Sequence, residues 1–476
     1  MATSPLASSS VGTLDVNSLV SQLMSLERRP IDKLNTQITG YQTKISSFGT
    51  ISGLVSSFQT ALSSLNNSLQ EFSATSSDTG IFSATAISTA AAGTYALEVT
   101  KLAQSQNLVA AGQASSNTAI SDGTATTVTF DFGTISGGTL TAGSYSGATF
   151  TTNGSATRSI TIDGTNNTLQ GIRDAINAAK MGVTATIVND GSATPYRLAL
   201  TSNNSGVSNS LKISTTGGDG TLNTLLGYDP AGIQNLNQTV AAQNASFKVN
   251  GIAIDKTSNI VTDAIQGVTL TLSKITTTPA ALTVAHNTSA VSTAGAGFVD
   301  AFNALASQLK SRSAFGNATA AGGALAGDGT VRLMLSQLRD IFTTAASGGT
   351  LTHLSQVGIS FKSDGTLKLD SSKLNSAITG DFSDVTNLFS SATGFATRLD
   401  VWSTSILSSG GLIDTRTTSL NTSIKGYNDQ ISRLESRMTA LQKLYTTQYS
   451  NLNMMLSNMN NTSTYLTQQF SKNTGA

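Results

Sequence analysis

Apolar residues recur at every third or fourth position in the stretch Ile431-Ser-Arg-Leu-Glu-Ser-Arg-Met-Thr-Ala-Leu441. A spacing that averages about 3.5 residues is typical of the seam along which the helices of a coiled coil pack. The same spacing extends from Leu420 to Leu466, so the sequence predicts a long amphipathic helix near the C-terminus. The seam residues that we single out in this helix are Ile431, Leu434, Met438, Leu441, Leu452, Met455, Met459 and Leu466.

A matching stripe begins close to the N-terminus, where apolar residues from Val16 to Phe48 alternate steps of three and four. Its seam residues are Leu19, Leu23, Ile31, Leu34 and Ile38. Because the two stripes lie near opposite ends of the sequence, the economical arrangement is an antiparallel pair of terminal helices, which we call the leg. The rest of the chain is then a long insertion at one end of the leg.

Three residues in the N-terminal stripe are candidate hinges. Pro30 fits best in the first turn of a new helix, where its missing N–H costs nothing, so we expect a joint or kink there. At Gly49 and Gly53 the apolar register slips by one residue, and glycine is a poor helix former. We therefore expect a break there, between the leg and a helix that belongs to a packed domain.

The middle of the chain has the alternating pattern of short β-strands separated by Gly, Asn and Asp turns. Helical spacing returns from Phe298 to Leu309 and from Val331 to Phe342. A hairpin is predicted around Ser363-Asp-Gly365, with Asp370 placed to cap a following helix. The expected strands include residues 95–100, 128–132, 183–188 and 196–200.

A weak internal repeat relates residues 168–177, followed by Gly182-Val-Thr184, to residues 259–266, followed by Gly267-Val-Thr269. The repeat predicts two units in which one short helix lies across a small sheet. Chance similarity in a Thr-rich chain is the alternative explanation.

These patterns predict an α+β fold with terminal antiparallel coiled-coil helices, a helical and β domain next to them, and two nested β-rich head domains. We expect a leg of residues 1–45 with 425–476, a helix-rich domain of 46–76 with 290–424, a β-rich head domain of 77–111 with 240–289, and an outer β-rich head domain of 112–239.

Composition excludes several classes of function. The 476 residues carry a formal charge of +1, and only 11% of them are charged. Binding to nucleic acid or to an anionic membrane is therefore not expected, and no window is apolar enough to span a membrane. The N-terminus also lacks the features of a Sec signal peptide.

No catalytic constellation emerges from the sequence. The chain has no Cys, and its two histidines, His286 and His353, do not sit in a ligand spacing. The Asp-Gly pairs lack the spacing of a calcium loop and indicate turns. We therefore expect no catalytic residues, no metal and no cofactor.

A stripe of methionine and aromatic side chains near the C-terminus comprises Tyr445, Tyr449, Met454, Met455 and Met459. Such residues on a terminal helix suit an adaptable protein surface that receives partner helices. A self-contained helical hairpin is the alternative.

Several motifs together resemble the FliD family of bacterial flagellar filament-capping proteins, also called the flagellar hook-associated protein 2 family. Residues 12–31 look like that family's opening pattern L-D-x-x-x-L-V-x-x-L-M-x-x-E-x-x-P, and residues 160–202 are similar to the flagellin and hook "IN" motif. The resemblance covers nearly the whole chain except residues 111–158. Further matches are Gly327-Asp328 with Val331-Arg332, residues 357–360 with 364–367, residues 385–389, residues 459–466 and residues 468–470.

The resemblance implies a cap at the distal tip of the flagellar hook or filament, which blocks leakage of exported flagellin and helps it fold and insert. It implies secretion through the flagellar type III export apparatus. It also implies a ring of identical subunits, a pentamer or similar small ring, with flagellin, hook-filament junction proteins and an export chaperone as partners. The leg would dock on the axial structure, and the head domains would form the plate of the cap.

Two other classes share some of these features. Another axial flagellar protein, such as flagellin or a hook-filament junction protein, would also have terminal coiled coils and a β-rich middle. A secreted adhesin would share the Cys-free β modules but has no need for two matched terminal stripes. An enzyme would require a cleft with converging carboxylates of perturbed pKa.

Overall fold

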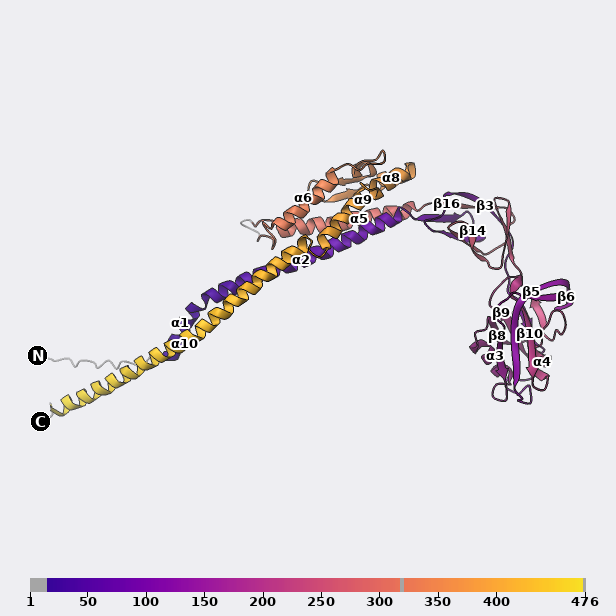
Figure 1. Cartoon of the computed structure of the whole chain (residues 1–476), viewed down its shortest axis with the longest axis horizontal. Coiled ribbons are helices and arrows are strands. Elements are labelled where there is room, and N and C mark those ends of the chain that lie inside the picture. Colours follow the sequence, from indigo (N-terminus) through magenta and orange to yellow (C-terminus); the bar gives the residue numbers. More distant parts are fainter. Residues whose placement is uncertain (1–14, 317–320, 474–476) are drawn as a thin grey trace. The chain divides into compact units, whose positions relative to one another are not determined.

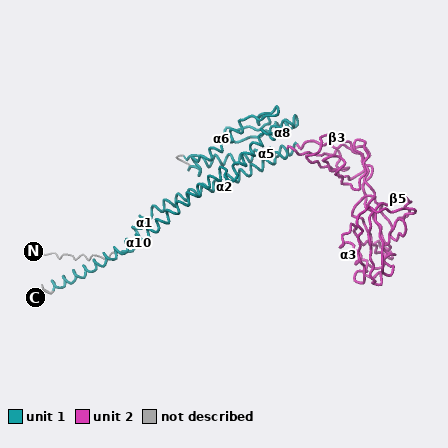
Figure 2. Tube along the Cα trace, in the orientation of Figure 1, with its two compact units in different colours: residues 1–68, 288–476 teal, residues 69–287 magenta. Residues whose placement is uncertain are grey.

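The computed structural model describes residues 15–316 and 321–473 (Figure 1). Residues 1–14, which include the start of the predicted leg, lie outside the described part. The chain forms two compact units (Figure 2), one of Met1–Ser68 with Thr288–Ala476 and the other of Leu69–Asn287. Both ends of the chain therefore belong to unit 1, and unit 2 is one continuous insertion.

Unit 1 is built on three helices from the two ends of the chain. They are α1 (Val16–Glu27), α2 (Arg29–Ser68) and α10 (Leu412–Asn473). Both α1 and α2 contact α10 and run antiparallel to it (Figure 1). The predicted antiparallel pairing of the terminal helices is confirmed, and the two stripes meet along the part of α10 that contacts α1 and α2.

A joint separates α1 from α2. Asp15 caps α1 by accepting a hydrogen bond from the backbone N–H of Ser18 at 3.0 Å. The helix ends at Glu27, and α2 begins at Arg29. Pro30 therefore lies in the first turn of the second helix, where a missing N–H is tolerated. A hinge role for this joint stays a prediction.

The expected break at Gly49 and Gly53 is wrong, because α2 is one uninterrupted helix of 40 residues. Both glycines are exposed. On the other side of the helix Phe48, Ile51 and Val55 are completely buried. Tertiary packing of this face outweighs the low helix propensity of two glycines, which is about 1 kcal/mol each.

The C-terminal half of α2 lies in a small helical domain. Its other elements are α5 (Thr288–Ser313), α6 (Gly329–Thr343), β17 (Ile359–Phe361), β18 (Leu367–Leu369), α7 (Ser371–Gly380), α8 (Phe382–Ser390) and α9 (Phe395–Leu407). Aromatic rings fill the core: Phe58 lies 5.7 Å from Phe298 and 6.0 Å from Phe302, between ring centroids. The predicted hairpin is present, and Asp370 caps α7 by accepting from the backbone N–H of Lys373.

Unit 2 contains two separate hydrophobic clusters. The first lies between a five-stranded and a three-stranded sheet and includes Phe82, Leu97, Phe247 and Leu270. In the five-stranded sheet the order is β1 (Phe72–Ser76), β16 (Ala280–His286), β3 (Gly93–Lys101), β12 (Ala245–Val249) and β13 (Ile252–Lys256). The three-stranded sheet has the order β14 (Ile260–Ile265), β15 (Val268–Leu272) and β2 (Phe82–Ala86).

Strand β1 corrects one expected boundary. It pairs along its whole length with β16, from Phe72 opposite His286 to Ser76 opposite Leu282. Residues 72–76 therefore lie in a head sheet, not in the helix-rich domain predicted for 46–76. The four-part division of the chain otherwise stays a prediction, and the two separate clusters of unit 2 support it.

The second cluster of unit 2 is enclosed by two four-stranded sheets and two helices. One sheet contains β10 (Ser210–Gly217), β5 (Thr126–Thr141), β6 (Ser144–Thr152) and β7 (Arg158–Ile162). The other has the order β11 (Asn237–Val240), β4 (Asn107–Val109), β9 (Tyr196–Ser202) and β8 (Val183–Asn189). The helices are α3 (Leu169–Ala178) and α4 (Thr221–Leu226), and Tyr228 is completely buried among them.

Only the first half of the predicted repeat contains a helix. Thr168 caps α3 as expected, accepting from the backbone N–H of Gly171 at 3.0 Å. The second predicted helix is wrong, because Ile260–Ile265 is strand β14. Its β-branched residues pair with β15 across a turn at Gly267, whose φ of +70° favours glycine.

Asn177, from the sequence resembling the "IN" motif, joins α3 to β8. Its side chain donates to the carbonyl of Ala185 at 2.8 Å and accepts from the N–H of the same residue at 2.9 Å. One amide group therefore satisfies both backbone groups of a strand residue, which fixes the helix against the sheet.

A buried polar network in unit 2 predicts a large effect of one substitution. Gln106, which is fully buried, donates to Gln238 at 2.5 Å and accepts from the backbone N–H of Leu211 at 2.6 Å. Gln106→Leu leaves the buried N–H of Leu211 without this acceptor. It also leaves the side-chain oxygen of Gln238 only a long hydrogen bond from the hydroxyl of Tyr228, at 3.5 Å, so it is expected to cost about 2–4 kcal/mol. The measurement is loss of hydrogen-exchange protection in β4 and β9, with the exposed Gln104→Leu as the control that has no effect.

Candidate functional site

The predicted N-terminal seam residues line the face of α1 and α2 that meets α10. Ile31 and Ile38 are buried. Leu19, Leu23 and Leu34 are half-buried. The helices that carry them contact α10 directly, so the structure brings this half of the stripe together with its partner.

The predicted C-terminal seam residues fall into two groups. Met438 is buried, and Ile431, Leu434 and Leu441 are half-buried along the part of α10 that pairs with the N-terminal helices. Further along the helix the side chains are exposed, and the exposed fractions are Leu452 42%, Met455 62%, Met459 61% and Leu466 49%. The structure therefore does not bring this second group against another described element.

The exposed end of α10 forms one continuous apolar stripe, which we call the Met stripe and define as Met454, Met455, Met459, Leu466 and Phe470. These side chains line a shallow hollow of ≈ 800 Å³ along a single helix. No charged residue occurs between Leu444 and Ser471. The Met stripe is thus an uncharged apolar surface with flexible side chains, which suits an adaptable interface.

Two tyrosines that occupy positions of the two apolar stripes meet each other in the leg. The rings of Tyr41 and Tyr427 stack with centroids 5.7 Å apart and planes inclined by 20°. A hydrogen bond with Tyr41 raises the pKa of Tyr427 above its usual value. The stripes contain both tyrosines but did not predict that these two would contact each other. The shared Gly-Tyr dipeptide in the two helices is a signal that could have paired them.

An ion pair fastens the start of α10 to α6. The side chain of Arg416 donates from Nε at 3.0 Å and from Nη2 at 2.9 Å to Asp328, whose own side chain is only 1% exposed. Asp328 also caps α6 by accepting from the backbone N–H of Thr330 at 3.0 Å. The sequence marked Asp328 in a motif but gave no sign of its partner.

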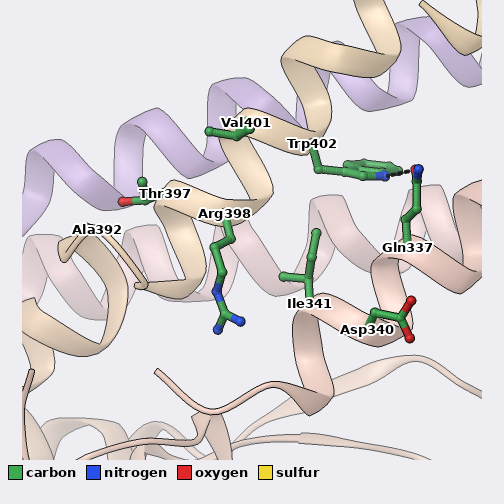
Figure 3. A pocket seen from close by; sticks show the side chains of 8 residues that line it. All are labelled: Gln337, Asp340, Ile341, Ala392, Thr397, Arg398, Val401 and Trp402. Atoms are coloured by element: carbon green, nitrogen blue, oxygen red, sulfur yellow. Dashed lines mark hydrogen bonds between the residues drawn. The ribbon is translucent and has the colours of Figure 1, made fainter. Parts of the chain in front are cut away.

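A second hollow, of ≈ 520 Å³, lies between α6 and α9 (Figure 3). Trp402 closes one side of it and donates from its indole N–H to Gln337 at 3.0 Å. Arg398 lies on another side, stacks on Phe395 and donates to the carbonyl of Thr344. Burial lowers the pKa of this guanidinium. Trp402 is the single tryptophan of the chain, so its fluorescence reports on unit 1 alone.

Within residues 15–316 and 321–473, no group of three or more His, Cys, Asp or Glu side chains is placed to hold a metal ion. In the same part of the chain, no helix is both long and apolar enough to cross a bilayer.

Paired terminal helices from both ends of the chain, together with an inserted β-rich unit, define the class of architecture to which the protein belongs. Comparisons with known proteins identify the family. The N-terminal model of flagellar hook-associated protein 2 matches residues 12–106, its C-terminal model matches residues 242–461, and the flagellin hook IN motif matches residues 149–204. The chain belongs to the flagellar hook-associated protein 2 family.

Individual relatives agree over almost the full length. The flagellar hook-associated protein 2 of Escherichia coli K12 is 34% identical and is aligned over 97% of each chain. The B-type protein of Pseudomonas aeruginosa is 31% identical over 94% of each chain. A crystal structure of the D1-D2-D3 domains of the flagellar cap protein FliD from Escherichia coli matches with a TM-score of 0.66 and 35% identity, covering 79% of this chain and 99% of that one.

Proposed function

We propose that this protein is a flagellar filament cap, which assembles at the distal tip of the hook or filament. There it prevents leakage of exported flagellin and promotes its folding and insertion as the filament grows. The observation that carries the proposal is the uncovered Met stripe on a paired terminal helix, in a chain that belongs to the flagellar hook-associated protein 2 family.

The leg would dock on the axial structure through the Met stripe. An uncharged apolar stripe gains affinity by burying area and places little demand on exact geometry, because methionine side chains adapt to their partner. Flagellin and the hook-filament junction proteins are the proposed axial partners. A small ring of identical subunits, a pentamer or similar, would hold several legs around the filament axis.

The mechanism would rest on binding and geometry, not on covalent catalysis. The β-rich head domains would form a plate that blocks the escape of flagellin, and the legs would leave room for one incoming subunit. Export through the flagellar type III apparatus, with a dedicated chaperone, is part of the proposal. A chain with no Cys has no disulfide to form before or after that passage.

Removing the leg is the direct test. A chain lacking residues 1–40 and 425–476 is expected to keep its β circular dichroism signal, to lose helix and to fail to block flagellin leakage. Light-scattering mass on the full chain is expected to give a ring-sized oligomer. Trp402 fluorescence serves as the control for intact folding of the remaining helical domain.

Two outcomes would contradict the proposal. If the truncated chain still blocks leakage, the leg is not the part that attaches the protein to the axial structure. If the purified full chain alone grows long filaments, it behaves as flagellin and not as a cap.

A further inference from the structure

The same dipeptide occurs at one level in both helices of the leg. Gly40-Tyr41 lies in α2 and Gly426-Tyr427 lies in α10. The two tyrosine rings stack on each other across the antiparallel seam, with centroids 5.7 Å apart. The two glycines are therefore neighbours of a direct contact between the helices.

Nothing in the local packing requires glycine at these two positions. A Cβ atom built on Gly40 or Gly426 meets no heavy atom within 4 Å outside the neighbouring backbone of its own helix, and neither residue has a positive φ. Alanine would fit both sites and favours a helix far more than glycine does. Both helices therefore contain a residue of low helix propensity at the same level, although no steric contact requires it.

On the C-terminal side of Tyr41, α2 begins to pack into the helical domain. Ser47, Phe48, Ile51 and Val55 are buried, and Arg312 of α5 donates to the hydroxyl of Ser47 at 2.8 Å. On the N-terminal side of Tyr41, the leg is a pair of helices outside the helical domain. Its buried apolar residues in the described part are Val20, Ile31, Ile38 and Met438.

We propose that Tyr41 and Tyr427 form a clasp, and that Gly40 and Gly426 let the part of the leg beyond it open as a unit. In the closed state the stacked rings hold α2 and α10 together where the leg leaves the helical domain. In the open state the helices fray at the glycines and expose Ile31, Ile38 and Met438. The proposal concerns the isolated chain and does not depend on the function proposed above.

Hydrogen exchange of the full-length protein tests the clasp. Gly40→Ala with Gly426→Ala is expected to slow exchange of amides in residues 31–39 and 428–441, by roughly fivefold for each glycine. Tyr41→Ala is expected to speed the same amides by roughly two- to tenfold, because it removes an aromatic pair. Exchange in residues 51–65 and the fluorescence of Trp402 are expected to stay the same in all variants.

A matched control lies in the same helix. Gly49 and Gly53 are also exposed and have open space around a built Cβ, but they lie where α2 is packed in the helical domain. Gly49→Ala with Gly53→Ala is expected to leave the exchange of residues 31–39 and 428–441 unchanged. The clasp is refuted if this control slows those amides equally, or if the Gly40 and Gly426 substitutions leave them unaltered.

Discussion

Replacing Arg416 with Ala is expected to lower the free energy of unfolding of unit 1 by about 3–5 kcal/mol. The substitution leaves the carboxylate of Asp328, whose side chain is 1% exposed, without its charged partner. An uncompensated buried charge costs more than the pair itself contributes, because the desolvation penalty remains. The same change also unties the first turns of α10 from the N-terminus of α6.

Urea denaturation followed by Trp402 fluorescence measures this effect, since the only tryptophan lies in the same unit. Arg433→Ala is the matched control, because Arg433 is an exposed arginine of the same helix with no ion pair among the described residues. Its effect is expected to stay within about 0.5 kcal/mol. A cycle with Asp328→Asn and the double variant separates the coupling energy from the loss of the helix cap. A loss below about 1 kcal/mol for Arg416→Ala would mean that water solvates the pair.

The double substitution Met455→Glu with Met459→Glu is expected to weaken docking by at least about 100-fold while leaving the stability of the free protein unchanged. Both side chains are more than half exposed, so the folded chain loses no packing. Burying a methionine is worth about 1.5–3 kcal/mol, and two lost side chains account for the factor before any cost of desolvating glutamate. Binding to isolated filament tips and flagellin leakage from complemented cells are the measurements.

Ser457→Glu with Asn461→Glu is the control for added charge. These residues lie on the same exposed helix but outside the hollow lined by the Met stripe. Their substitution is expected to leave docking intact. Equal loss of docking in both double variants would show that charge on α10, and not the Met stripe, is what the partner senses.

The sequence was most informative where one element carries its own pattern. The seam spacing around Ile431 and Ile31 predicted the terminal helices, and Asp370 and Thr168 predicted helix starts, because these signals are local. The break at Gly49 failed because burial of Phe48 and Ile51 overrides local propensity. The helix expected at residues 259–266 failed because pairing with β15 decides the conformation of those residues.

The parts of the site that escaped prediction depend on contacts between distant residues. Arg416 meets Asp328 across 88 positions of sequence, and Gln106 meets Gln238 across 132. No periodicity marks either partner. The seam pattern also could not predict that Met455 and Met459 are exposed. Such a pattern identifies the apolar face of a helix but not the position at which the partner helix ends.

Unit 1 is assembled from both ends of the chain, and this affects the order in which the two units can fold. Gln59 of α2 bonds to Asp400 of α9, 341 residues later, whereas unit 2 is one continuous stretch. Wherever the chain emerges N-terminus first, unit 2 can therefore complete its sheets before the helices that cover Phe48 and Phe58 of α2 have followed. Closing so long a loop is slow, and the last part of the protein to become native is the part that holds the leg.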